Sequence, residues 1–457
     1  MSKHQPLVTL YIVNYNYCRY LEKAIKSALN QTYDNLEILI IDDGSTDKSH
    51  LIIDEYEQNK LIRVFRGKNE GLIACCNKAL QNANGEFIIR LDADDYFAKD
   101  AIQLLVKKIL DNPSVGLVFP DYWEINEHDS IIKRVRRFDF DKDVSLLNLP
   151  AHGAGTLFKK KLLISLGGYD ESFTRQDGYD MWLKIIRNHK VTNINKPLFF
   201  YRQHSNNLTK DKVKLLKTRN KILEKHFVKA GFSSSTAALI PIRGNSDSEI
   251  NFSLAPLGEK KLIQWTIDNA LRSKYLKYIF VMSSSKKIKG FLEGLYQDKI
   301  FFINRDISDE LMNTSIDTSL GYLEKLDFID DLDSLLILNQ EYPFRGQFLI
   351  DSSIFNYKLF GLDTVIVAEQ DNSVFFKHNG HTLVKTTKEK LKVERNYIFK
   401  QVGGLTLVDL KQFAKSRNIL GKKIGHLEAD QLSSFRISTD LDMEMAEMLA
   451  ENKHERD

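Results

Sequence analysis

Residues 8–47 read VTLYIVNYNYCRYLEKAIKSALNQTYDNLEILIIDDGSTD, and two short apolar runs in this stretch enclose a segment with helical spacing. The runs at residues 8–13 and 36–41 are too continuously apolar for half-exposed strands, which predicts strands buried on both faces. Between them, residues 20–29 place apolar side chains at helical intervals. The order strand, helix, strand favours a parallel pair of strands joined by a crossover helix.

The same alternation continues to residue 110. Apolar runs at residues 62–65 and 86–91 predict two further strands, and helical spacing recurs at residues 48–58, 72–82 and 99–110. We therefore expect an α/β fold with a mostly parallel sheet and helices on its faces. In such sheets ligands bind outside the carboxyl ends of the strands. Polar clusters follow three of the predicted strands, at residues 14–16, 42–47 and 92–95.

Length and composition indicate a globular protein of more than one domain. A chain of 457 residues predicts two or three domains, and its 43% hydrophobic and 28% charged content is ordinary for folded proteins. The net charge of +4 favours neither nucleic acid nor an acidic partner. The three cysteines have no metal-binding spacing and form no even disulfide framework, which fits a reducing cytoplasm. Since no export signal and no long apolar stretch is present, we expect a cytoplasmic protein without a membrane span.

The stretch RLDADDYF at residues 90–97 places Asp92, Asp94 and Asp95 directly after a predicted strand. Three carboxylates so close repel one another unless a cation lies among them. Neither a GxGxxG nor a GxxxxGK[ST] motif follows the first strand, so phosphates would have to be neutralised in another way. Asp92 and Asp94 are hard oxygen ligands that suit Mg²⁺ or Mn²⁺. The alternative is that Asp94 and Asp95 cap the helix predicted from residue 99.

The ordered motifs resemble a known family. The stretch at residues 8–47 is followed by NEGLIACCNKAL, GEFIIRLDADD, LGGYDESF and QDGYDMWLKI, and over residues 5–209 the chain resembles the family-2 glycosyltransferases with the GT-A fold. The resemblance implies metal-dependent transfer of a sugar, with inversion, from a nucleoside diphosphate sugar to a glycan, lipid-linked or protein acceptor. It implies assembly of bacterial surface glycan or glycoprotein, with Mn²⁺ or Mg²⁺ as the cofactor.

The resemblance also implies roles for individual residues. Asp43 would hold the nucleotide base and Tyr15 would pack on it, while Asp92 and Asp94 would contact the ribose and the metal. His204, in YRQHSNNLT, would close over the diphosphate and join the metal ligands.

Asp177 would be the general base, which contributes typically about 10² to 10⁴ in rate. It could also be a helix N-cap, with Asp180 in the first turn, and these two roles are compatible. The sequence departs from the family at two places. Gln176 replaces the usual Glu beside the base, and Cys76 stands where relatives commonly carry Arg, so a positive charge near the donor is expected to be missing.

Residues 211–229 have helical spacing and a basic composition, which fits either contact with an anionic membrane surface or a solvated helix face. GFSSST at residues 231–236 is typical of a hinge. Beyond it a second α/β pattern predicts a helix and four strands. The helix is expected at residues 262–272, and the strands at residues 237–242, 278–283, 299–304 and 334–339.

This second part resembles, over residues 237–449, cytidylyltransferases that activate sialic acid, related nonulosonic acids or Kdo as CMP sugars. Its markers are LIPIRGNSDSEINFSLAPLGEKKLIQWTIDNAL, SDELMNTSIDTSLGYLEKL, LILNQEYPFR and TDLDMEMAEML. In active relatives a loop after the first strand binds the triphosphate. Arg243 and Gly244 are retained from this loop, but Asp247 and Glu249 add negative charge to it. Where the family carries a metal-binding Asp-Ile-Asp, this chain has Arg436, Ile437 and Ser438 and retains only Asp442.

These losses predict a silent cytidylyltransferase-like module for dimerisation or binding. The expected organisation is two Rossmann-like domains, a glycosyltransferase domain at residues 1–210 and a cytidylyltransferase-like domain at residues 235–457, joined by a basic helix and linker at residues 211–234. A homodimer through the second domain is expected because active relatives dimerise. Two alternatives stay open, a bifunctional enzyme that also makes a CMP sugar, and a non-catalytic carbohydrate-binding scaffold.

Overall fold

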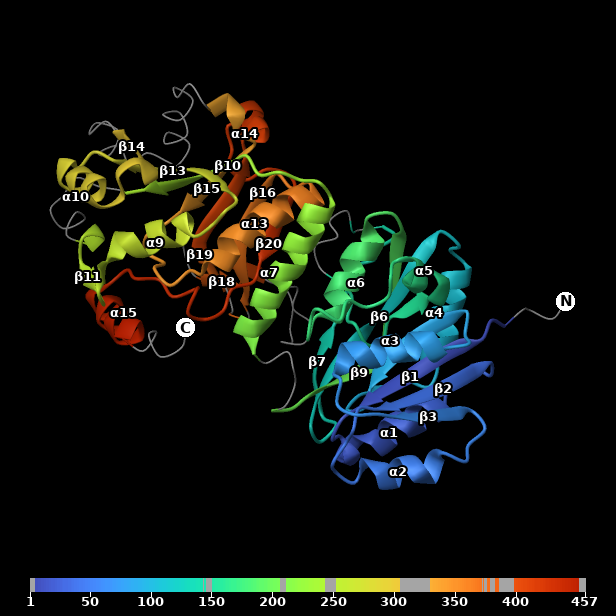
Figure 1. The fold of residues 1–457 in the computed structure, drawn as a ribbon. Coiled ribbons are helices and arrows are strands. Elements are labelled where there is room, and N and C mark those ends of the chain that lie inside the picture. Colours follow the sequence, from blue (N-terminus) through green and yellow to red (C-terminus); the bar gives the residue numbers. More distant parts are fainter. Residues whose placement is uncertain are drawn as a thin grey trace. The chain divides into compact units, whose positions relative to one another are not determined.

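The computed structural model describes residues 5–142, 144, 150–205, 211–242, 252–304, 329–371, 373, 376–378, 383–385 and 398–451. The chain divides into two compact units, residues 1–219 and residues 220–457 (Figure 1). The division falls within helix α7 (Lys212–Lys229).

The first unit is built on a mixed sheet with the strand order β3-β2-β1-β4-β8-β6-β9-β5, to which β7 is added beside β6. Its β1–β4 half is parallel, as predicted. Beyond β4 the sheet is mixed, because β8 runs antiparallel to both β4 and β6. The strands are β1 (Val8–Asn14), β2 (Leu36–Asp42), β3 (Ile62–Arg66), β4 (Phe87–Asp92), β5 (Tyr96–Phe97), β6 (Val115–Asn126), β7 (Ile131–Val135), β8 (Leu157–Lys159) and β9 (Lys190–Gln203).

The strand order places a switch point between β1 and β4. From β1 the chain proceeds to β2 and β3 on one side, and then returns to β4 on the other side of β1. Asn14 pairs with Asp42 across β1 and β2, and Val13 pairs with Asp92 across β1 and β4. The polar clusters of three strands therefore meet at one edge, which is where α/β sheets of this kind bind ligands.

Helices cover both faces of this parallel half. In Figure 1, α1 and α2 lie on one face of β1–β3 and α3 lies on the other. The buried side of α1 consists of Leu21, Ala24, Ile25 and Ala28, at the i, i+3, i+4, i+7 spacing of an amphipathic helix. The helices are α1 (Cys18–Leu29), α2 (Ser49–Tyr56), α3 (Leu72–Asn82), α4 (Ala101–Leu110), α5 (Lys160–Ser165) and α6 (Asp177–Ile186).

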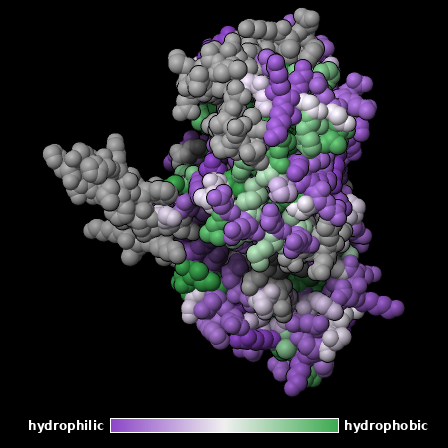
Figure 2. All heavy atoms as spheres, turned by 90° about the vertical axis from the view of Figure 1, so that its left-hand side faces the viewer, coloured by the Kyte–Doolittle hydropathy of each residue, from purple (hydrophilic) through white to green (hydrophobic). Residues whose placement is uncertain are grey.

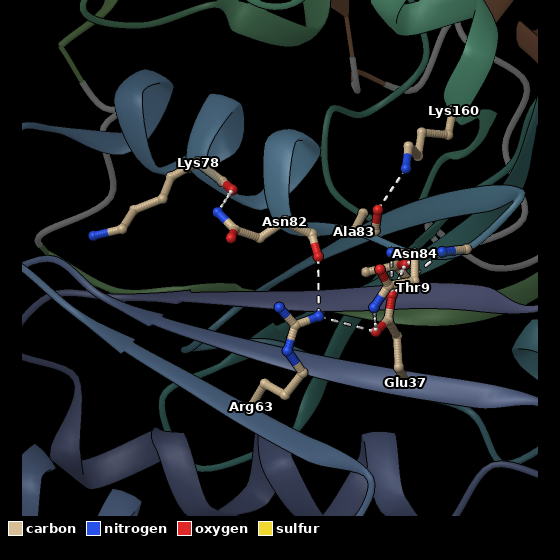
Figure 3. Close-up of polar contacts among 9 residues, drawn as sticks. Thr9, Glu37, Arg63, Lys78, Asn82, Ala83, Asn84 and Lys160 are labelled. Atoms are coloured by element: carbon tan, nitrogen blue, oxygen red, sulfur yellow. Dashed lines mark hydrogen bonds and ion pairs between the residues drawn. The ribbon is translucent and has the colours of Figure 1, made fainter.

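A polar network ties the opposite ends of the strands together (Figure 3). Glu37 on β2 accepts hydrogen bonds from the Thr9 hydroxyl and from the backbone and side-chain amides of Asn84. Arg63 on β3 donates to Glu37 at 3.3 Å and to the Asn82 carbonyl at 3.0 Å. The loop before β4 is thereby fixed to three strands, which sets the position of β4 and of the acidic cluster at its far end.

The second unit has its own sheet, with the order β14-β13-β10-β15-β19-β16-β20. Strands β14, β13, β10 and β15, near the four strands predicted, are parallel to one another, and β19 runs antiparallel between β15 and β16. The strands are β10 (Thr236–Pro241), β13 (Leu276–Ser283), β14 (Phe301–Asn304), β15 (Ser334–Leu338), β16 (Thr364–Asp371), β19 (Ile398–Asp409) and β20 (Ile424–Leu427). Two hairpins are added, β11 (Pro256–Leu257) with β12 (Lys260–Lys261), and β17 (Phe376–His378) with β18 (Leu383–Lys385). The helices are α9 (Leu262–Leu271), α10 (Lys286–Tyr296), α13 (Gln347–Phe360), α14 (Leu410–Ser416) and α15 (Asp440–Glu451).

The second half of α7 belongs to the second unit. The ring of Phe227 is buried, with its centroid 5.6 Å from that of Tyr275 and 5.0 Å from that of Phe355. The Tyr275 hydroxyl donates to Glu224 at 2.6 Å. Most of the basic side chains that marked this helix in the sequence are exposed, namely Lys212, Lys214, Lys217, Lys221 and Lys229.

The surface is mixed in polarity. On the face shown in Figure 2, hydrophobic residues occur as patches interspersed with hydrophilic ones. None of the helices in the described ranges combines the length and apolar character that crossing a bilayer requires.

Candidate functional site

The carboxyl ends of β1 and β2 are joined by side-chain hydrogen bonds. Asn14 donates to Asp42 at 2.8 Å, and the Ser45 hydroxyl donates to the same carboxylate oxygen at 2.6 Å. Asp43 is buried, and its two carboxylate oxygens accept from the backbone amides of Glu70 at 2.8 Å and Gly71 at 2.9 Å. Asp43 therefore fixes the loop that precedes α3, and its carboxylate also has a side-chain hydrogen bond with Cys75.

Tyr15 lies on the loop after β1, next to the strand end that Asp43 contacts. The backbone amide of Asp43 donates to the Asn14 carbonyl at 2.8 Å. The Tyr15 side chain is 41% exposed, which leaves its ring accessible. The structure thus brings the two predicted base-binding residues to neighbouring strand ends.

The acidic cluster at the end of β4 is held by the end of β9. Asp94 Oδ2 lies 2.8 Å from Nε2 of His204, and Asp95 accepts from the backbone amide of Arg202 at 2.8 Å. The Arg202 side chain donates to the Asp94 carbonyl at 2.7 Å. The predicted neighbourhood of Asp94 and His204, which are 110 positions apart in the sequence, is therefore present in the fold.

The alternative role of Asp94 and Asp95 as helix caps is wrong. Helix α4 begins at Ala101, and Asp100 is its N-cap residue. The turn at residues 92–95 comes before β5, so its carboxylates lie too early in the chain to reach the first turn of that helix.

Electrostatics show that this cluster has too little positive charge of its own. Burial and the neighbouring Asp94 and Asp177 raise the pKa of Asp92 to about 6, although Arg90 acts in the opposite direction. Burial, Asp94 and Asp92 also raise the pKa of Asp95 well above its usual range, and its Oδ2 is buried with no hydrogen-bond partner. A cation among these carboxylates would relieve both effects.

No ready-made metal cage is present in the described part of the chain, where no three His, Cys, Asp or Glu side chains are grouped to hold an ion. Asp94 and His204 are in contact, whereas Asp92 lies against Arg90. Mg²⁺ is usually held by one or two carboxylates together with substrate phosphates rather than by an all-protein cage. The residues present fit a metal that is bound jointly with a diphosphate.

Arg90 is a site residue that the sequence analysis missed. Its guanidinium is buried; Nη1 donates to Asp177 Oδ2 at 2.5 Å, and Nε lies 3.0 Å from Asp92 Oδ1. Nη1 also lies 3.4 Å from the sulfur of Cys76, so the positive charge expected to be missing there is supplied from β4. The sequence did contain a signal for this role. Arg90 stands inside a strand predicted to be buried on both faces, where a charged side chain needs a partner of opposite charge.

Asp177 lies at the start of α6, but it is not the cap. The N-cap residue is Gln176, which adopts the left-handed conformation with φ of 62° and accepts from Arg219 Nε at 2.8 Å. The alternative role of Asp177 as an N-cap is therefore wrong, because its carboxylate binds Arg90 instead. Non-glycine residues rarely adopt this conformation, and those that do are often found at functional sites. Asp180, in the first turn as predicted, pairs with Lys184 at 2.9 Å.

The segment containing His152 and Gly153 passes close to this ion pair. A Cβ atom at position 153 would lie 2.8 Å from Arg90 Nη2 and 3.4 Å from Asp177 Oδ2, so only glycine allows this approach without a shift. Gly155 donates its backbone amide to the Arg90 carbonyl at 2.9 Å. His152 is brought to the site in this way, and no spacing in the sequence indicated it.

In the second unit, the three residues that stand in place of the metal-binding motif contain no carboxylate. Arg436 and Ser438 are exposed, while Ile437 is fully buried in an apolar cluster. Asp442 accepts from the backbone amides of Ser438 and Thr439, each at 2.9 Å, and thus holds the turn before α15. The predicted loop residues Arg243, Gly244, Asp247 and Glu249 lie outside the described residues.

The fold and site define the first unit as an α/β domain with an acidic ligand site at the switch point of its sheet. Residues 9–167 match the family model for Glycosyl transferase family 2, and residues 237–319 match the model for Cytidylyltransferase. The first unit thus carries a family-2 glycosyltransferase domain and the second a cytidylyltransferase domain, which confirms both resemblances.

Relatives match up to about half of this chain. A chondroitin synthase of Pasteurella multocida is 31% identical over 225 residues, which are 49% of this chain and 23% of that protein. A hyaluronan synthase of Pasteurella multocida is 30% identical, with 49% and 22% covered. An uncharacterized glycosyltransferase of Rickettsia typhi is 33% identical over 195 residues, 41% of this chain and 60% of that protein. The chain therefore spans less than a quarter of the length of the two synthases.

Among solved structures, a mannosyltransferase of Pyrobaculum calidifontis in complex with GDP-Man and Mn²⁺ is 18% identical. The match covers 50% of this chain and 65% of that one at a TM-score of 0.40, which is too low to support an inference.

Proposed function

We propose that this chain is an inverting, metal-dependent glycosyltransferase that moves a sugar from a nucleoside diphosphate sugar to a glycan, lipid-linked or glycoprotein acceptor. Asp177 is the general base, Tyr15 and Asp43 bind the nucleotide, and Asp92, Asp94 and His204 are the residues that would hold Mn²⁺ or Mg²⁺. Two of the relatives are named a chondroitin synthase and a hyaluronan synthase, which favours a saccharide as the acceptor.

One observation carries this proposal: a single guanidinium, that of Arg90, contacts both Asp177 and Asp92. The candidate base and the candidate donor-binding carboxylate are thereby both bound to one side chain. Direct displacement with inversion needs a base for the incoming hydroxyl and charge stabilisation for the leaving diphosphate at a short separation. The Arg90 bridge keeps these two functions at a fixed distance.

Each residue has a distinct part in the reaction. Asp177 accepts the proton of the acceptor hydroxyl on a carboxylate oxygen, and Arg90 fixes the orientation of that carboxylate. The loop that Asp43 holds and the exposed ring of Tyr15 take the base of the nucleotide. When bound, a divalent cation supplies Lewis-acid stabilisation of the leaving diphosphate.

The second domain serves as a module for binding or dimerisation without its own catalysis. Support comes from Arg436 and Ser438, which replace carboxylate ligands with exposed side chains that do not bind Mg²⁺ well. Support also comes from Asp442, whose carboxylate already stabilises the turn before α15. Retention of the fold without these ligands favours a structural role over synthesis of a CMP sugar.

The test is release of nucleoside diphosphate from a panel of nucleotide sugars by the purified full chain with Mn²⁺. Wild type should hydrolyse one donor slowly, and both Asp94→Asn and Asp177→Asn should abolish this release. A true donor at a hundred times its dissociation constant should add about 2.7 kcal/mol of apparent stability. Absence of any donor that binds or reacts would overturn the proposal, and release of pyrophosphate from CTP with a nonulosonic acid would overturn the silent role of the second domain.

A further inference from the structure

Four aromatic side chains of the first unit, Tyr122, His152, Phe199 and Tyr201, lie together, and we call them the aromatic group. The His152 ring centroid lies 4.6 Å from that of Tyr201, 5.3 Å from that of Phe199 and 5.5 Å from that of Tyr122. Phe199 is fully buried, whereas Tyr122, His152 and Tyr201 are each partly exposed. The aromatic group thus has one fully buried ring, that of Phe199, and three residues that keep some solvent exposure.

The aromatic group is adjacent to the residues proposed for the reaction. His152 directly precedes Gly153, where a Cβ atom would be 3.4 Å from Asp177 Oδ2. Burial and Arg90 lower the pKa of His152 to about 4, while Asp177 and Asp94 act in the opposite direction. His152 is therefore within electrostatic range of both the candidate base and a candidate metal ligand, and it stays neutral at neutral pH.

The hydrogen bonding of His152 determines which ring nitrogen carries the proton. Nδ1 lies 3.1 Å from the Ala154 carbonyl, and since a carbonyl oxygen only accepts, Nδ1 is the protonated nitrogen. Nε2 is then a hydrogen-bond acceptor, and no group in the described part of the chain donates to it. A neutral acceptor of this kind suits a hydroxyl group, which can donate, and not a phosphate, which cannot.

Aromatic faces beside a single neutral acceptor form a surface suited to a sugar. The C–H face of a pyranose ring is apolar and packs on aromatic rings, while a few placed polar groups fix its orientation through its hydroxyls. Phosphates would instead suit the positive charge of Arg90 and a cation bound by the acidic cluster. The aromatic group is thus chemically distinct from the nucleotide-binding part of the site.

We propose that Tyr122, His152 and Tyr201 form a subsite for a pyranose ring, with the ring packed on the face of one of the two tyrosines, whose planes are 88° apart, and a hydroxyl donating to His152 Nε2. The inference rests on the proposed glycosyl transfer, since it places a sugar ring within reach of Asp177. The ring comes either from the acceptor saccharide or from the sugar of the donor, because both present the same chemistry.

The test uses methyl glycosides of glucose, galactose, N-acetylglucosamine and glucuronic acid as probes of the full chain by saturation-transfer NMR. Saturation of the wild-type protein should be transferred to the C–H protons of at least one probe. His152→Phe, which keeps a ring but loses the acceptor, and Tyr201→Ala should each weaken that binding about tenfold. His152→Gln, which restores an acceptor, should recover part of it. His128→Ala, which removes a histidine side chain that is 71% exposed, is the matched control and should bind as wild type does.

Addition of UDP and Mn²⁺ separates the two sources of the ring. A probe that stays bound beside UDP and Mn²⁺ but is not displaced by UDP-sugars assigns the subsite to the acceptor, whereas displacement only by the UDP-sugar with the same ring assigns it to the donor. The subsite is overturned if the wild-type protein transfers saturation to none of the probes. It is also overturned if wild type, His152→Phe and Tyr201→Ala transfer saturation to a probe equally. Calorimetry of UDP with Mn²⁺ tests the transfer reaction separately, because saccharide binding without nucleotide binding would contradict that reaction and leave the subsite standing.

Discussion

The guanidinium of Arg90 binds the carboxylate of Asp177 across 87 positions of the sequence, with both side chains buried. The same guanidinium lies 3.0 Å from Asp92, so β4 and the start of α6 are joined at the site. Buried ion pairs contribute little net stability on average, but removal of one partner leaves an uncompensated charge. We therefore interpret Arg90 as a positioning residue that holds the candidate base.

Substitution of Arg90 should separate charge from geometry. Arg90→Gln removes the charge and leaves the buried carboxylate of Asp177 and the partly buried carboxylate of Asp92 unpaired, which should cost about 3–5 kcal/mol of unfolding free energy. Arg90→Lys keeps the charge but cannot form the planar fork, so it should recover part of the stability and less of kcat. The measurement is denaturant unfolding together with kcat and KM for the donor. Equal loss of kcat and of donor affinity, or full rescue by lysine, would contradict a positioning role.

Asp177→Asn should lower turnover while leaving donor binding largely intact. A general base contributes typically about 10² to 10⁴ in rate, and the amide cannot accept the proton. The nucleotide is bound by other residues, so calorimetric affinity for UDP with Mn²⁺ should change little. Asp180→Asn is the matched control, because Asp180 is buried on the same helix but pairs with Lys184. A control that loses turnover to the same extent would assign the effect to the fold of α6.

Binding of metal and nucleotide should depend on the ionisation of Asp92. Its pKa is raised to about 6, so the carboxylate is ionised above that pH and protonated below it. A cation binds the ionised form, and its apparent affinity should therefore fall by about tenfold per pH unit below the pKa of Asp92. Calorimetry of UDP with Mn²⁺ from pH 5 to 8 measures this.

Asp92→Asn is the control for that experiment, because titration of the diphosphate itself is common to both proteins. The component due to Asp92 should be absent from the variant. If the two proteins show the same pH profile, Asp92 does not titrate with metal binding.

The parallel half of the first sheet was predictable because each of its strands is a short apolar run separated by a helical segment. The mixed half was not, since β6 and β9 are long strands with polar residues and β8 has only three residues. Their pairing is set by tertiary contacts rather than by local pattern. Helix α3 was predicted at its observed bounds from the helical spacing of residues 72–82, and in the structure Gly71 precedes it with φ of 92°.

Some of the contacts within the candidate site could be predicted and others could not, while the roles of its residues stay predictions. Asp94 and His204 come together as the resemblance implied, because motifs retain spatial relations that spacing alone does not show. Arg90 and His152 were missed because their roles depend on pairing between distant segments. Gly153 is the physical reason for both, since its lack of a side chain lets the segment containing His152 pass beside the Arg90 guanidinium.

Glu37 should stabilise the first unit in a pH-dependent way through the network in Figure 3. Burial opposes its ionisation, but hydrogen bonds from Thr9 and Asn84 and the charge of Arg63 outweigh burial and lower its pKa. A carboxylate with a lowered pKa in the folded state contributes stability that is present above its unfolded pKa and is lost as pH falls through its folded pKa. Glu37→Gln should lose about 1–3 kcal/mol of unfolding free energy at pH 7, because the backbone amide of Asn84 loses a charged acceptor.

Glu127→Gln, at a side chain that is 50% exposed, is the control and should stay within about 0.5 kcal/mol of the wild-type unfolding free energy. Urea unfolding at pH 7 and below about pH 4 should show the Glu37→Gln deficit shrinking on acidification, and a deficit that is constant with pH would assign it to packing rather than to charge.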